Sequence, residues 1–206
     1  MVTVLLFFVF FIIKGVDGFF KCILPKHERV NTARSHYHKA QRVSSVKYTS
    51  TNVFSDFEFH DAFFKLEHYV DNTLTVSVKY LNIHKNVGQN PHPTDMEIDV
   101  ARLTFHNFRV ILFDPGRNFK QDENGKWYTD DPQILFTGET AETKLLQELF
   151  SGATVFEFGI TENQHFYFDG SGTEMWFHVE FRMDSATVQW DTFRGPAWYE
   201  KPPFQH

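Results

Sequence analysis

The chain has 206 residues and a formal net charge of −6, and its two parts differ in charge. Residues 1 to 52 hold eight Lys and Arg against two Asp and Glu, a charge of +6, whereas residues 53 to 206 hold 12 against 24, a charge of −12. An acidic domain repels the phosphates of nucleic acids, so its partners are not expected to be nucleic acids. Cys22, the only cysteine, lies outside the acidic part, which excludes an internal disulfide and a cysteine-ligated zinc site there.

The basic part opens with an apolar run and continues without a regular pattern. Val2 to Ile13 is shorter than the roughly 20 residues that a transmembrane helix needs, so no transmembrane span is expected. From Pro25 to Asn52, basic residues are scattered without helical or strand period, which predicts disorder. We therefore expect a disordered basic segment over residues 1–52, a single β-rich domain over residues 53–200 and a tail over residues 201–206.

The apolar run has more than one interpretation, and each implies a different cellular location. Its length matches the apolar part of a signal peptide, although no Lys or Arg precedes it and Val16-Asp17-Gly18 is a poor cleavage site. In that case the protein is exported, or is associated with a membrane through residues 2–13. Alternatively, translation starts at a GTG codon for Val53, since no Met lies between Met1 and Met96, and the protein is cytoplasmic. A third interpretation is a short basic arm.

Alternating apolar residues and turn residues predict a mainly β domain, an antiparallel meander or sandwich, from residue 53 onward. The first pair of strands is expected between Phe64 and Tyr80. A three-residue loop over Asp71–Thr73 would place Val70 opposite Leu74 and Phe64 opposite Tyr80, with the apolar side chains on one face. Further strands are expected over Met96–Phe113, with an interruption near His106-Asn107, and over Gln133–Thr137, Thr154–Ile160 and His165–Phe168.

One segment, Thr140 to Phe150, has the period of an α-helix. Its apolar residues fall on a single stripe that should pack against the sheet, and Gly152 is a suitable helix stop. The stripe consists of Ala141, Leu145, Leu146 and Leu149.

The last two strands suggest a hairpin and a binding surface. If Asp184-Ser185 is a two-residue loop, Glu174–Met183 pairs with Ala186–Phe193, and one face of the pair is apolar. Because an exposed Trp in an acidic field is typical of binding hot spots, we interpret the other face as a candidate partner surface. The inward residues are Val179, Phe181, Val188 and Trp190, and the outward residues are Trp176, His178, Asp191 and Phe193.

His60 and Asp61 invite comparison with the His-Asp pair of metal-dependent phosphohydrolases. That pair acts on a helical scaffold with further ligands from separate helices, whereas this chain has one predicted helix. A metal ion needs at least three converging ligands, and no ligand spacing is visible among the other histidines and aspartates. We therefore interpret His60 and Asp61 as structural residues before the first strand, and we expect no metal and no cofactor.

The segment Phe57-Glu58-Phe59-His60-Asp61-Ala62, with the strand Leu74–Leu81 and Asp95-Met96-Glu97-Ile98, carries a family resemblance. It resembles small uncharacterised bacterial β-rich proteins that open with a Phe-His-Asp-Ala element, some of which are similar to immunity proteins of polymorphic toxin systems. The resemblance covers about residues 54 to 200, implies a start near Val53 and assigns no active residue.

Charge and resemblance together favour a non-catalytic acidic binding protein, of immunity type, that masks a basic protein partner. Opposite charges speed such an encounter, and buried aromatic anchors hold the complex. Two alternatives stay open. One is a hydrolase, either metal-dependent through His60 and Asp61 or based on a carboxylate pair, and the other is a carbohydrate-binding module that uses Trp176.

Overall fold

The structure is a computed structural model that describes residues 46–174 and 176–200. The predictions for the apolar run, for Cys22, for most of the basic segment and for the tail therefore lie outside the described residues. In the part that is described, no helix is both long enough and apolar enough to cross a membrane.

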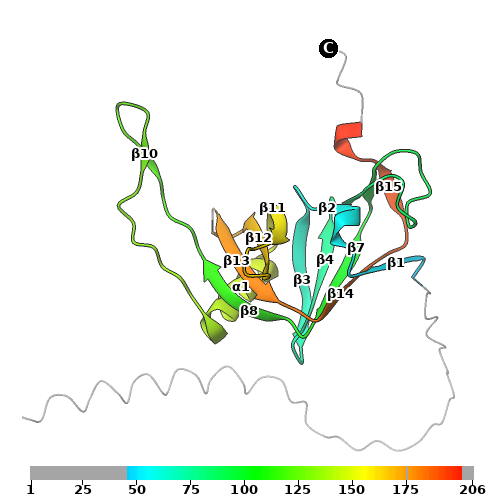
Figure 1. Cartoon of the computed structure of the whole chain (residues 1–206), viewed down its shortest axis with the longest axis horizontal. Coiled ribbons are helices and arrows are strands. Elements are labelled where there is room, and N and C mark those ends of the chain that lie inside the picture. The colour runs from blue at the N-terminus through cyan, green and yellow to red at the C-terminus, as the bar shows by residue number, and fades with distance from the viewer. Residues whose placement is uncertain (1–45, 175, 201–206) are drawn as a thin grey trace, which may run out of the picture. The chain divides into compact units, whose positions relative to one another are not determined.

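The described part is built mainly from antiparallel β-strands with one α-helix, which confirms the predicted fold class (Figure 1). Its main element is an open sheet of nine strands. In spatial order these are β1 (Tyr48–Thr51), β14 (Ser185–Trp190), β7 (Ala101–His106), β4 (Thr73–Lys79), β3 (Phe63–Val70), β11 (Ala153–Ile160), β12 (Phe166–Ser171), β13 (Phe177–Arg182) and β8 (Arg109–Asp114).

Two smaller sheets and the helices complete the fold. One has four strands in the order β15 (Phe193–Pro196), β6 (Met96–Ile98), β5 (Asn82–Ile83) and β2 (Phe57–Glu58). The other is a short ladder of β9 (Lys120–Gln121) and β10 (Trp127–Tyr128), in an arm that extends away from the sheet in Figure 1. The helices are α1 (Gly138–Ser151) and the short 3₁₀ helices η1 (Phe54–Asp56) and η2 (Trp198–Glu200).

The large sheet bends at a corner that two pairs of strands share. β7 continues into β8 and β13 continues into β14, and the two continuous segments stay paired on both sides of the bend. At the corner the N–H of Asp184 donates to the carbonyl of His106 (2.9 Å), and the side-chain amide of Asn107 donates to the carboxylate of Asp184 (3.1 Å). Strands that pass through such corners fold one sheet over its own inner face.

The core on this inner face is aromatic. The buried ring of Phe181 lies 5.6 Å from that of Phe105 and 5.0 Å from that of Phe108, so it joins the two sides of the bend. It also lies 5.8 Å from Phe166 on the neighbouring strand. These ring contacts hold the two sides of the bend together in addition to the strand pairing of β3 with β11.

Helix α1 confirms the prediction for Thr140 to Phe150, and Leu145 and Leu149 are buried. It packs against β3 and β8. Gly152 ends the helix at φ +102°, and a Cβ there would lie 2.2 Å from the ring of Phe63, so both backbone and packing require glycine. Glu148 is also buried, since its carboxylate accepts the backbone N–H of Thr173 (2.6 Å), a contact that helical periodicity does not predict.

The sheet begins earlier in the chain than the boundary predicted at Val53. Strand β1 lies before Val53 and pairs with β14, and the ring of Tyr48 stacks on that of Trp190 at 5.4 Å. Ser50, the other inward residue of β1, is buried but polar. With one aromatic residue and one serine facing inward, the strand has no apolar alternation that the sequence could reveal.

The predicted register of the first hairpin is wrong. Val70 pairs with Thr73, so Asp71 and Asn72 alone form the loop, and both have positive φ (+50° and +56°), as a type I′ turn requires. A β-bulge at Glu67, between Leu66 and His68, then shifts the register, so that Tyr69 and not Val70 lies opposite the buried Leu74, and Val70 is exposed. As a result Phe64 pairs with Val78 and not with Tyr80.

The predicted pairing of the last two strands is also wrong, although the four residues predicted to face inward do so, whereas Phe193, predicted to face outward, packs against the core. The segment at Asp184 and Ser185 is the corner described above and not a tight turn, so β13 pairs with β12 and β8 whereas β14 pairs with β1 and β7. Alternation shows which side chains face the core but does not identify the neighbouring strand. The inward residues Val179, Phe181, Val188 and Trp190 are all buried, as predicted.

Candidate functional site

The candidate site lies where β3 and β11 separate. The two strands pair only through Phe63 with Thr154 and Phe64 with Ala153. The chain before β3 continues this contact for a short distance, since Asp61 N–H donates to the carbonyl of Val155 (2.9 Å). Beyond that point residues of η1 and β2 face those of β11 across a space that both sides line.

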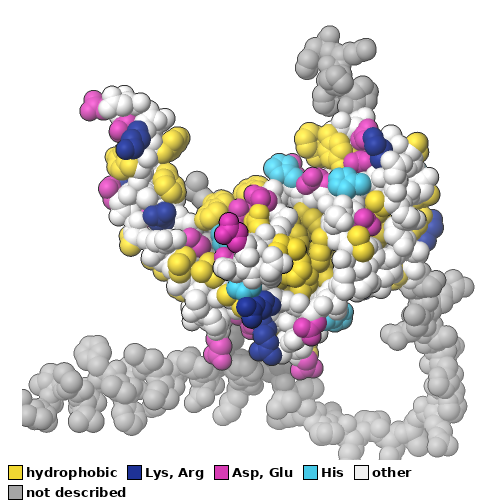
Figure 2. Space-filling view, in the orientation of Figure 1, with side chains coloured by type: hydrophobic (Ala, Val, Ile, Leu, Met, Phe, Trp, Pro, Cys, Tyr) yellow, Lys and Arg dark blue, Asp and Glu magenta, His cyan; other side chains and the backbone are white. Residues whose placement is uncertain are grey.

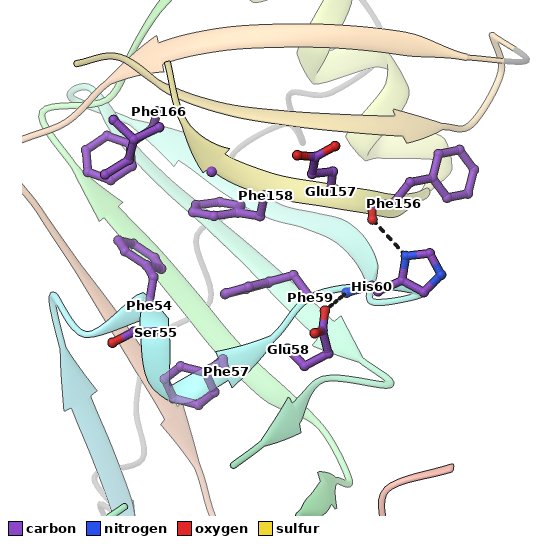
Figure 3. Close-up of a pocket in the computed structure, with 12 residues that line it drawn as sticks. Phe54, Ser55, Phe57, Glu58, Phe59, His60, Phe156, Glu157, Phe158 and Phe166 are labelled. Carbon is purple, nitrogen blue, oxygen red and sulfur yellow. Dashed lines mark hydrogen bonds between the residues drawn. The ribbon is translucent and has the colours of Figure 1, made fainter. Parts of the chain in front are cut away.

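A cavity of about 540 Å³ fills this space, within the range of ligand pockets in proteins (Figure 3). We call it the phenylalanine pocket. On the inner face of the sheet, Figure 2 shows hydrophobic side chains gathered in a hollow, with acidic side chains nearby. The pocket is lined by Phe54, Ser55, Phe57, Glu58, Phe59 and His60 on one side and by Phe156, Glu157, Phe158, Gly159, Ile160 and Phe166 on the other.

The aromatic wall of the pocket is held in place by ring contacts. Phe59 stacks on Phe158 with centroids 4.6 Å apart and planes 22° apart. Phe54 lies 5.0 Å from Phe158 and 5.7 Å from Phe166, and these three rings are only half-buried. Ile160, at the mouth, is 56% exposed. An apolar ligand would therefore meet a wall that is already formed, which lowers the cost of binding.

The ionisable groups that line the pocket are two carboxylates and one histidine. The carboxylate of Glu58 accepts a hydrogen bond from the backbone N–H of His60 (2.8 Å), and the carboxylate of Glu157 accepts one from the hydroxyl of Tyr167. This hydrogen bond, with partial burial and the charges of nearby carboxylates, raises the pKa of Tyr167 to about 12, so the phenol keeps its proton at neutral pH. No Lys or Arg is among the lining residues, and the border of the pocket is anionic.

His60 and Asp61 lie in the turn that closes this region. His60 Nδ1 donates to the carbonyl of Phe156 (2.8 Å), which Figure 3 shows as a dashed line, and Asp61 has a φ of +67°. Their side chains are 3.8 Å apart and exposed. Within the described ranges, no three His, Cys, Asp or Glu side chains are grouped so that they could hold a metal ion.

The partner surface predicted on the last hairpin does not exist as a single surface, because β13 and β14 are not neighbours. Trp176 lies just before β13, 40% exposed, with its ring 6.4 Å from that of His178. Asp191 and Phe193 follow β14 instead. Asp191 accepts the backbone N–H of Lys47 (2.9 Å), and Phe193 packs on Tyr48 at 5.2 Å.

His178 belongs to a polar network on the outward face of β12 and β13. Its Nδ1 is 2.6 Å from the carboxylate of Asp169, and its Nε2 is 3.7 Å from that of Glu180. The carboxylate of Glu180 also accepts a hydrogen bond from Nδ1 of His165 (3.0 Å), and the guanidinium of Arg182 lies 2.8 Å from Nε2 of the same ring. The hydrogen bond to Asp169 raises the pKa of His178, although burial opposes it. Sequence reasoning found His178 alone, because the network depends on the pairing of β12 with β13.

The sequence did not predict the pocket, although the Phe57-Glu58-Phe59-His60 segment on one side of it was noted for its family resemblance.

Comparisons of the chain with protein-family profiles, with curated proteins and with solved structures find no match.

Proposed function

We propose that this is a non-catalytic binding protein that masks a basic protein partner, and that an apolar side chain of the partner occupies the phenylalanine pocket. The observation that carries the proposal is the combination of a preformed aromatic cavity with the carboxylates of Glu58 and Glu157 at its border. An apolar anchor in a pocket supplies most of the binding energy in many interfaces, and acidic groups around it select a cationic partner.

The charge of the surrounding chain supports the same class of partner. Residues 53 to 206 carry 24 Asp and Glu against 12 Lys and Arg, so a basic protein is attracted before contact is made. The resemblance of Phe59-His60-Asp61-Ala62 to immunity-like proteins adds a finer proposal, namely that the masked partner is a toxin domain.

Selection from a display library of random peptides on the immobilised full-length chain tests the proposal. We expect the selected peptides to combine an apolar residue with Lys or Arg. Their binding should be lost in Ile160→Lys, which puts a cation at the mouth of the pocket, and kept in Val70→Lys, which changes the net charge equally. Val70 is a matched control because it is 58% exposed, lies at the far end of β3 and does not line the pocket. Selected peptides without positive charge, or equal binding by both variants, would argue against the proposal.

A further inference from the structure

Among the described strands, none pairs with one edge of β11 along the pocket. On its other edge β11 pairs with β12, with Glu157 opposite Asp169 and Gly159 opposite Tyr167. The backbone N–H of Thr161 continues this ladder by donating a hydrogen bond to the carbonyl of His165 (2.8 Å). In antiparallel pairs the backbone groups of successive residues point to opposite edges. The N–H and C=O groups of Phe158 and Ile160 therefore point away from β12.

On the side of β3, the backbone contacts of β11 in the described part of the chain end at Phe156. The backbone N–H of Val155 donates a hydrogen bond to the carbonyl of Ala62 (2.8 Å), and the carbonyl of Val155 accepts one from the N–H of Asp61. The carbonyl of Phe156 accepts a hydrogen bond from Nδ1 of His60. Phe158 and Ile160 come next, and both line the pocket. An unpaired edge of this kind is a template for another strand.

The side chains of β11 give the two faces of this edge different chemistry. Phe158 points inward to the aromatic wall, whereas Glu157 and Gly159 lie on the outward face beside Tyr167. A Cβ on Gly159 would lie 2.8 Å from the ring of Tyr167, so glycine lets that ring pack flat over the strand. A strand added here would place alternate side chains against phenylalanines and against an acidic face.

We propose that the occupant of the phenylalanine pocket is an extended peptide segment that adds to the free edge of β11 as a further strand. Its apolar side chains face Phe54 and Phe158, and its Lys or Arg side chains, at alternate positions, face Glu157. This inference rests on the proposed function, since it specifies how the basic partner is held. Backbone hydrogen bonds then provide affinity, and the alternation of apolar and basic residues provides specificity.

The test uses the full-length chain and the synthetic peptide KVKLKVK, with VVLKKKK, which has the same kind of residues without alternation, and EVELEVE as controls. We expect KVKLKVK alone to bind and to slow hydrogen exchange at the amides of Phe158 and Ile160 by about tenfold or more. N-methylation of the apolar residues of the peptide should abolish binding, because in an antiparallel addition their N–H groups face β11, while N-methylation of its lysines should be tolerated.

Other outcomes would overturn the inference in distinguishable ways. Binding that is lost in Ile160→Lys but is insensitive to every N-methylation, with no protection of the two amides, contradicts strand addition and leaves the proposed function standing. Absence of binding by all three peptides counts against strand addition and against the proposed function together. Protection of the same amides without peptide, rising with protein concentration, would instead identify a second copy of the chain as the occupant.

Discussion

The rings of Phe59 and Phe158 stack 4.6 Å apart although their segments are not paired strands, since β2 pairs with β5 and β11 with β3 and β12. The aromatic wall of the pocket is thus maintained by side-chain packing, and no strand of the described part of the chain pairs with the edge of β11 beside it.

Replacement of Phe158 should weaken the fold to a limited degree because the ring is half-buried. Phe158→Ala removes its contacts with Phe54 and Phe59, and we expect a loss of about 2 to 4 kcal/mol in the free energy of unfolding. Phe158→Leu, which keeps most of the volume, should lose less than about 1.5 kcal/mol. Urea denaturation measures both, and a negligible loss in Phe158→Ala would show that the stacked pair does not hold the pocket.

The helix should depend on its buried stripe and not on its exposed residues. Leu145→Ala empties a fully buried site against the sheet, at an expected cost of about 2 to 5 kcal/mol in unfolding free energy. Phe150, on the same helix, is 73% exposed, so Phe150→Ala should change that free energy by no more than about 0.5 kcal/mol. Equal effects of the two changes in thermal or urea unfolding would contradict this packing.

The hydrogen bond between Asp169 and His178 should make stability depend on pH. Because the pKa of His178 is raised on folding, its contribution is complete below the ordinary histidine pKa of about 6.5 and is lost as the pH rises through the raised value. Asp169→Asn should lower the pKa of His178 in an NMR titration. It should also destabilise the chain more at about pH 5.5 than at about pH 9, and the opposite order would refute the assigned cause.

The buried carboxylate of Asp95 should anchor the C-terminal end of the described chain. It accepts hydrogen bonds from His84 (3.0 Å), from the backbone N–H of Lys85 (2.8 Å) and from the hydroxyl of Tyr199 (3.0 Å). Burial raises its pKa, but these bonds outweigh that effect and the pKa is lowered, so its contribution is present at neutral pH and is lost as the pH falls through the lowered value.

Asp95→Asn should therefore cost about 2 to 3 kcal/mol of unfolding free energy at neutral pH, and the loss should shrink in acid. The exposed pair of Asp130 with Lys120 offers a control, since Asp130→Asn should cost nearly nothing. A difference between the two variants that does not depend on pH would show that the charge of Asp95 is unimportant.

The sequence predicted the features that depend on local pattern. Leu145 and Leu149 follow a helical stripe, and Val179 and Phe181 follow a period of two, so their burial could be inferred without any knowledge of neighbours. The helix stop at Gly152 was likewise visible, because glycine readily adopts the positive φ that ends a helix.

Features that depend on long-range pairing could not be predicted in the same way. A bulge at Glu67 and a two-residue turn keep Phe64 and Leu66 on the apolar face, as the expected three-residue loop does, but they place Tyr69 there instead of Val70, and the period-two pattern does not reveal a bulge. A corner at Asp184 preserves the same alternation as a hairpin. The pocket combines Phe54 with Phe158, which are distant in sequence, and the free edge of β11 exists only because β3 leaves it after two residue pairs.

The most direct test of the central claim, that the phenylalanine pocket binds an apolar and basic segment, is the affinity of KVKLKVK for three full-length chains measured by calorimetry. We expect binding to the wild type, an affinity reduced by about tenfold or more in Ile160→Lys, and an unchanged affinity in Val70→Lys, because only the first substitution places a cation at the mouth of the pocket. Equal affinities for all three chains, or no binding to any of them, would contradict this claim.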